Sequence, residues 1–123
     1  MSIGSNHFRG DVVLLDVIYV TGQGSKIRPA VVIQTDNLNA RLQSTMLAVI
    51  TTNTTRAATE PTQLLIDITT SEGQATGLLA PSTVKCAHLI TANQSRIKRK
   101  IGRFSPTLLT QLEVCLKAAL ELS

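Results

Sequence analysis

Aromatic residues are scarce in this chain of 123 residues. It has no Trp, one Tyr and two Phe, so a core must be built from Leu, Ile, Val and Ala. A nucleic-acid site that stacks bases on aromatic rings would have few rings to use. The length is typical of one domain around one core. We therefore expect a single domain over residues 1–123 with an aliphatic interior.

Metal ligands and long apolar runs are also few. Cys86 and Cys115 show no Cys-x-x-Cys spacing and are expected to be reduced structural thiols. His7 and His88 lie far apart and no close carboxylate pair stands out, so we expect no metal site and no cofactor. No apolar run approaches the roughly 18 residues of a membrane span, and the first residues are polar. These features predict a cytoplasmic protein without membrane contact.

The charge balance is modestly basic, at +4. Such a field favours polyanions, either nucleic acid or an acidic protein tail, without selecting between them. Five basic residues fall within eight positions with no acid between them: Arg96, Lys98, Arg99, Lys100 and Arg103. This cluster is compatible with contacts to an RNA backbone or an acidic partner, and equally with a solvated face.

Short apolar, β-branched runs separated by turn residues dominate the chain. Strands are predicted at 12–20, 29–34, 45–52, 63–68, 77–80 and 83–91, with a last edge strand within 93–104. Residues 37–44 predict a short helical turn, 69–76 predict a turn, and the glycine-containing stretch 21–27 predicts a mobile loop. Arg28 stands at a loop-to-strand junction because the following proline disfavours helical geometry.

The pattern changes at Ser105, which suits a helix N-cap and is followed by Pro106 at the first helical position. Leucines then recur at helical spacing as far as Leu120. The sequence therefore predicts an α+β fold, in which a small barrel of five to seven strands is covered by a C-terminal amphipathic helix.

Several sequence pieces follow one another with specific gaps. They are RGDVVLLDV (9–17), a glycine-rich loop, IRPAVVIQTD (27–36), LAVIT (47–51), VKC (84–86) and IGRFSPTLLTQLEVCLKAAL (101–120). Their order resembles the MazF/PemK family of toxin endoribonucleases over nearly the whole chain. The resemblance implies an SH3-like barrel, a homodimer, and metal-independent, sequence-specific cleavage of single-stranded RNA. It also implies inhibition by an antitoxin with an acidic, extended tail.

The resemblance further implies that Arg28 and Thr51 form the catalytic centre. A guanidinium suits charge developing on phosphorus, because its planar donors match phosphate oxygens. It is a poor base, since its pKa lies above roughly 12. Arg28 is thus expected to stabilise charge and Thr51 to donate a hydrogen bond. Thr52 could fill the role of Thr51 if the register is shifted by one residue, and is otherwise an expected RNA contact.

Further RNA contacts are expected around this centre. The loop 21–27 carries Gln23 and Lys26, whose donors could read exposed bases while the glycines let the loop move. The resemblance adds Lys85, from the VKC piece, as a cation beside the centre.

The chain also departs from the family pattern. Ala87 stands where many members have Asp, Ile90 where an Arg precedes Thr91, and Leu14 where the first strand often has an aromatic residue. These changes are compatible with an altered RNA preference, with weaker activity, or with a non-catalytic barrel that binds RNA or a protein such as gyrase. Neither the RNA sequence that is cut nor the cognate antitoxin can be read from the chain.

Overall fold

The computed structural model describes residues 7–18 and 22–123. Its six strands are β1 (Asp11–Ile18), β2 (Ser25–Val32), β3 (Ser44–Thr51), β4 (Gln63–Ile66), β5 (Ser82–Asn93) and β6 (Ile97–Arg103). Its helices are α1 (Asp36–Arg41), α2 (Ser71–Ala75) and α3 (Pro106–Leu120), and a 3-10 turn, η1 (Gln94–Arg96), joins β5 to β6. No helix in these ranges is long and apolar enough to cross a membrane.

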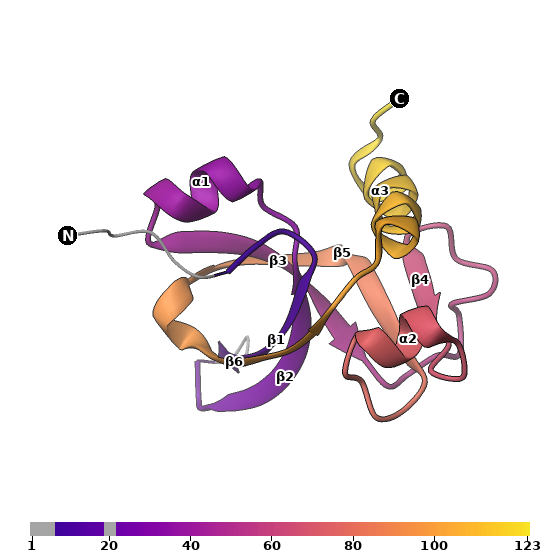
Figure 1. The fold of residues 1–123 in the computed structure, drawn as a ribbon, viewed down its shortest axis with the longest axis horizontal. Coiled ribbons are helices and arrows are strands. Elements are labelled where there is room, and N and C mark those ends of the chain that lie inside the picture. Colours follow the sequence, from indigo (N-terminus) through magenta and orange to yellow (C-terminus); the bar gives the residue numbers. More distant parts are fainter. Residues whose placement is uncertain (1–6, 19–21) are drawn as a thin grey trace.

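The strands form one antiparallel sheet in the order β4-β5-β3-β2-β1-β6. Figure 1 shows that the sheet curls, so that β1, β2 and β6 come round to face β3 and β5. The helices α2 and α3 gather at the β4 end, and α1 lies at the other end (Figure 1). The α+β barrel with a C-terminal helix is thereby confirmed.

Two apolar clusters lie on opposite faces of the strands. On one face, which we call the helix face, buried residues of β1, β2 and β3 such as Val12, Val31 and Ile50 pack with Phe104 and α3. On the other, the inner face, the cluster consists of Val13, Leu15, Ala30, Val32 and Leu47. Because side chains alternate along a strand, burial of both faces requires the nearly continuous apolar runs seen in the sequence.

The Arg-Gly-Asp sequence makes the turn into β1. The Phe8 N–H donates to Oδ2 of the fully buried Asp11, at 2.9 Å, and Gly10 takes the φ of +94° that this turn needs. The other carboxylate oxygen, Oδ1, lies 3.2 Å from Lys100 Nζ and 3.8 Å from Arg103 Nη1, both on β6. Lys100 and Arg103 of the basic cluster therefore have a structural role at the turn into β1.

One predicted strand and one predicted strand boundary are wrong. Residues 77–80 form a turn rather than a strand: Gly77 has a φ of +76°, and a Cβ there would lie 2.0 Å from the Ile101 carbonyl oxygen. Strand β2 begins at Ser25, because residues 25–27 pair with 16–18 of β1, so Arg28 lies within a strand and not at its start. The predicted turn 69–76 contains the short helix α2, whose N-cap Thr70 accepts a hydrogen bond from the Gly73 N–H.

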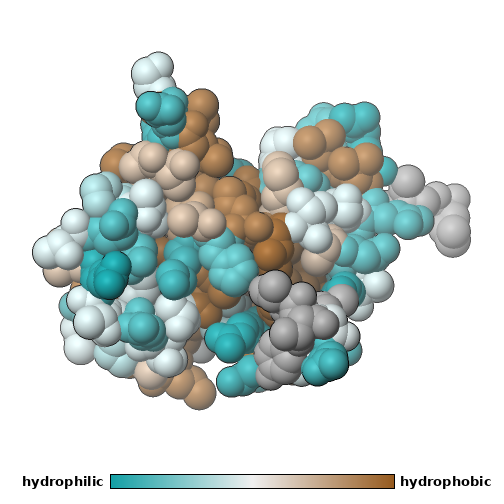
Figure 2. Space-filling view, turned by 180° about the vertical axis from the view of Figure 1, so that it is seen from behind, coloured by the Kyte–Doolittle hydropathy of each residue, from teal (hydrophilic) through white to brown (hydrophobic). Residues whose placement is uncertain are grey.

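The surface carries a hydrophobic band. Figure 2 shows it across the middle of one side of the molecule, between more hydrophilic flanks. Several large apolar side chains are strongly exposed in the chain, the most exposed being Leu79, with 97% of its surface free. The molecule thus has apolar surface beyond what its own helices cover.

Candidate active site

Arg28 and Thr51 lie on the inner face of adjacent strands, Arg28 within β2 and Thr51 at the end of β3. Arg28 is opposite Leu15 of β1 and shares its face with Ala30. Pairing between β2 and β3 reaches as far as Ala30 and Val49. The same register continued by two residues would bring Arg28 opposite Thr51. The two side chains predicted to form the catalytic centre are therefore directed to the same side of neighbouring strands.

Both groups have hydrogen-bonding capacity to spare. Arg28 is half-buried and forms no ion pair or side-chain hydrogen bond within the part of the chain that the structure describes. The Thr51 hydroxyl accepts from the Asn53 N–H at 3.2 Å, which leaves its own proton to donate. A half-buried, unpaired guanidinium beside a hydroxyl donor can bind an anionic oxygen from two sides.

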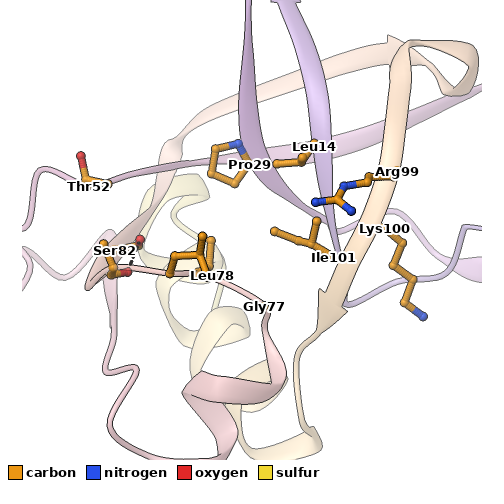
Figure 3. Close-up of a pocket in the computed structure, with 11 residues that line it drawn as sticks. Leu14, Pro29, Thr52, Gly77, Leu78, Ser82, Arg99, Lys100 and Ile101 are labelled. Atoms are coloured by element: carbon orange, nitrogen blue, oxygen red, sulfur yellow. Dashed lines mark hydrogen bonds between the residues drawn. The ribbon is translucent and has the colours of Figure 1, made fainter.

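Thr52 lies on the helix face, away from Arg28. It borders a largely apolar cavity of about 480 Å³ with Leu14, Pro29 and Ile101 among the lining residues. In Figure 3, Pro29 and Leu14 lie side by side, and Arg99 lies above Ile101. Thr51, the last residue of β3, shares the face of Arg28 by alternation, whereas Thr52, just beyond the strand, borders the apolar cavity. Leu14, where the family resemblance led us to expect an aromatic residue, belongs to this apolar cavity.

Lys85 lies on the inner face of β5, the strand that neighbours β3. It pairs with Val49 on one side and with Gln63 of β4 on the other. Its side chain borders a polar cavity of about 330 Å³, which we call the loop pocket, lined by Asn53, Thr55, Arg56, Gln63 and Lys85. The structure therefore brings Lys85 to the neighbourhood of Thr51, together with a cation, Arg56, that the sequence did not point to.

Gln23 and Lys26 flank the start of β2. Gln23 is exposed between Gly22 and Gly24, which both have positive φ. Lys26 is exposed opposite Val17 and, by alternation, shares the face of Arg28. Residues 19–21, which belong to the predicted first strand and loop, lie outside the described residues. Lys26 is thus the next cation along the strand from Arg28.

A bulge in β5 coincides with the departures from the family pattern. The pairing of β3 shifts from Ala48–Leu89 to Val49–Lys85, which leaves residues 86–88 of β5 without β3 partners. Ala87 is exposed in this bulge. Ile90 lies opposite Leu47 and packs against the inner apolar cluster. The position where the family resemblance led us to expect an Arg thus serves packing in this chain.

The two cysteines meet between β5 and α3. Both Cys86 and Cys115 are free and buried, as expected from the sequence. Burial, with a smaller contribution from Cys115, raises the pKa of the Cys86 thiol to about 12. Within the described residues, no group of three or more His, Cys, Asp and Glu is arranged to hold a metal ion.

The basic cluster is divided by its contacts. Lys100 and Arg103 lie near Asp11. Lys98 and Arg99 are exposed on the edge strand β6 and form no ion pair with any described residue. Their charges remain available to a polyanion.

Sequence comparison finds curated relatives over most of the chain. The chain is 31% identical over 118 residues to the protein named Endoribonuclease MazF9 of Mycobacterium tuberculosis (strain ATCC 25618 / H37Rv), covering 93% of this chain and 96% of that protein. It is 29% identical over 100 residues to Endoribonuclease MazF6 of M. tuberculosis (strain CDC 1551 / Oshkosh), covering 81% and 83%.

Solved structures share the fold. An endoribonuclease in complex with its cognate antitoxin, from a mycobacterial species, superposes with a TM-score of 0.77 at 19% identity and covers 95% of this chain and 97% of its own. A MazE-MazF crystal structure from Deinococcus radiodurans (Form-III) gives 0.72 at 18% identity, covering 97% and 100%. A family model described as "PemK-like, MazF-like toxin of type II toxin-antitoxin system" matches residues 8–120. The chain belongs to this family of PemK-like, MazF-like toxins.

Proposed function

We propose that this chain is a toxin endoribonuclease that cuts single-stranded RNA without a metal ion. In this proposal residues 1–123 act as one toxin domain, in a homodimer, in the cytoplasm where messenger RNA is found. The observation that carries it is the unpaired, half-buried Arg28 within β2, directed to the same face as Thr51 at the end of the neighbouring strand β3. The names of the two mycobacterial relatives support the same activity.

The chemistry follows from what Arg28 and Thr51 can donate. The ribose 2′-hydroxyl loses its proton to solvent and attacks the adjacent phosphorus, while the P–O5′ bond breaks and the leaving oxygen takes up a proton. The products are a 2′,3′-cyclic phosphate and a 5′-hydroxyl end. Negative charge builds on the non-bridging oxygens as phosphorus becomes five-coordinate. Arg28 stabilises that charge, and Thr51 adds a neutral donor.

The proposed inhibitor is an acidic antitoxin. Titles of solved neighbours describe a complex with a cognate antitoxin and MazE-MazF assemblies. The net charge of +4 and the exposed Lys98 and Arg99 favour an acidic partner for this chain. Addition of the cognate antitoxin should therefore stop RNA cleavage, with weaker inhibition at high salt.

The test of the function compares wild type with Arg28→Ala on a long single-stranded RNA in EDTA. We expect wild type to cut and the variant to be slower by about 100-fold or more, because one lost transition-state donor costs about that factor. Arg41→Ala is the matched control, since Arg41 lies on α1 and bonds only Asn37. Full activity of Arg28→Ala would refute the assigned role.

Two other results of the same assay bear on the mechanism. Cleavage that needs an added divalent cation would refute the metal-independent route, as would products with 5′-phosphate ends. Tight RNA binding without cleavage, over substrates of varied sequence, would instead identify the non-catalytic barrel. A sequencing map of the cut sites would supply the RNA preference.

A further inference from the structure

We infer that the loop pocket is a second phosphate-binding subsite, which holds the phosphate of a nucleotide next to the one that is cut. The inference rests on the endoribonuclease function proposed above and adds Arg56 to its RNA-binding residues. The composition and the position of the pocket favour the RNA backbone over a base as its ligand.

The pocket is polar and cationic throughout. Three separate pieces of chain build it: the loop after β3 contributes Asn53, Thr55 and Arg56, β4 contributes Gln63, and β5 contributes Lys85. Its cavity of about 330 Å³ is thus lined by two cations, two amides and the Thr55 hydroxyl. That hydroxyl donates its proton to Asn53 Oδ1 at 2.5 Å, so the cations and the amide N–H groups are the donors left for a ligand. Groups of this kind bind phosphate oxygens, and charged donors form the strongest such hydrogen bonds.

The two cations lack a counter-ion. In the described part of the chain, Arg56 and Lys85 form no ion pair and no side-chain hydrogen bond. The acid in the same loop, Glu60, accepts hydrogen bonds from the backbone N–H and the hydroxyl of Thr62, at 3.2 and 2.9 Å. Two like charges on one cavity repel each other, and a bound anion removes that repulsion.

The position of the pocket suits a continuous RNA strand. Lys85 pairs with Val49, and Thr51 is the next residue of β3 on that face. The Asn53 N–H donates to the Thr51 hydroxyl at 3.2 Å, so a lining residue of the pocket directly contacts a residue of the proposed catalytic centre. Arg28 and Lys85 stand on either side of β3. They are two strand spacings apart across the sheet and, because Lys85 pairs with Val49 while the continued register brings Arg28 opposite Thr51, two residues apart along it, or about 12 Å in all. That separation fits two successive phosphates better than one.

A base is a poorer ligand for this pocket. None of its described lining residues is aromatic, so it has no ring on which to stack a base. The side-chain carbonyl of Asn53 already accepts from the Thr55 N–H at 3.1 Å, which reduces the acceptors that could read a base edge. Specificity for sequence is left to other contacts.

The test measures binding apart from cleavage. An RNA oligonucleotide that spans a mapped cut site, with a 2′-deoxy sugar at the cut nucleotide, is titrated with wild type, Arg56→Gln and Arg56→Lys at several salt concentrations. We expect Arg56→Gln to weaken binding about 10-fold and to flatten the plot of log K against log salt by about 0.7, the value for one lost contact to a single strand. Arg56→Lys should keep most of the salt slope.

Control variants and a modified RNA show whether a change in affinity comes from the loop pocket. Arg41→Gln removes a charge on α1 and should leave affinity unchanged. Arg56 is exposed and unpaired, so Arg56→Gln should keep the wild-type thermal midpoint. Replacing one phosphate next to the cut site by an uncharged methylphosphonate should weaken wild type and have no further effect on Arg56→Gln.

The outcomes separate this inference from the function. If wild type cuts RNA, Arg28→Ala does not, and Arg56→Gln binds with wild-type affinity and slope, then the subsite is refuted and the function stands. If Arg56→Gln loses affinity but keeps the full salt slope, the pocket reads bases and the phosphate assignment is refuted. If wild type neither binds nor cuts RNA of any sequence, the function fails and the subsite fails with it.

Discussion

At the scale of single residues, the buried thiols of Cys86 on β5 and Cys115 on α3 make the stability of the fold depend on pH in the alkaline range. The folded state raises the pKa of Cys86 from 9.0 to about 12, mainly through burial. The protonated thiol is therefore favoured by folding, and this contribution is complete below about pH 9 and is lost as the pH rises from about 9 to about 12.

The prediction is a steeper loss of stability in wild type than in Cys86→Ala over that range. Urea midpoints measured at about pH 8.5 and about pH 10.5 for both proteins test it, because the difference between the two pH profiles isolates the Cys86 thiol. Parallel pH profiles would contradict the assignment. Neither thiol should react with a disulfide reagent until the protein unfolds, since buried thiols with raised pKa values are inert.

Individual site residues were predictable to the extent that a motif marks them. The family resemblance marked Arg28 in the piece IRPAVVIQTD and Lys85 in the piece VKC, and strand pairing places both on the inner face. The choice between Thr51 and Thr52 depended on strand register, which pairing with β2 and β5 determines. Arg56 lies in a polar loop without periodicity, so only the folded chain reveals that it lines a pocket with Lys85.

At the scale of elements, the N-cap of α3 also ties it to α2. The Ser105 hydroxyl accepts from the Leu108 N–H at 3.1 Å and donates to Glu72 Oε2 of α2 at 2.7 Å. We expect Ser105→Ala to lower the free energy of unfolding by about 1–2 kcal/mol, because it removes both a cap and a charged hydrogen bond.

Thr107→Ala is the matched control for the cap. Thr107 is exposed in the first turn of the same helix, so its loss should change stability by no more than about 0.5 kcal/mol. Chemical denaturation with unchanged m-values measures both variants. Equal stabilities of Ser105→Ala and wild type would show that the cap contributes nothing.

Elements with strong periodicity were predictable and their contacts were not. The leucine spacing and the Ser-Pro start identified α3, and apolar, β-branched runs between turn residues identified β1, β3 and β5. The stretch 77–80 is as apolar as a strand, yet Gly77 packs directly on the Ile101 carbonyl and turns the chain. The early start of β2 likewise follows from pairing with β1, which outweighs the turn composition of its first residues.

At the scale of the whole molecule, the exposed apolar surface bears on assembly. Leu79 is almost fully exposed, and Ile27 and Leu65 each have 45% of their surface free, while Figure 2 shows a hydrophobic band on one side. Large apolar patches on small proteins mark interaction sites, and homodimers with two-fold symmetry are the commonest assemblies.

The prediction is a dimer at micromolar concentration. Sedimentation velocity should give a species of twice the 13.2 kDa chain mass, and dilution should lower both its sedimentation coefficient and its thermal midpoint, since dissociation is linked to unfolding. A single 13.2 kDa species over the whole concentration range would contradict it.

The ion pairs between Asp11 and β6 constrain the order in which the chain can fold during synthesis. Strand β1 lies between β2 and β6, and its buried carboxylate meets Lys100 and Arg103, near the other end of the chain. A growing polypeptide folds only with the residues that have left the ribosome. The sheet that orients Arg28 therefore stays open on one side until β6 emerges. We expect the nascent toxin to be harmless to its own message until β6 has left the ribosome.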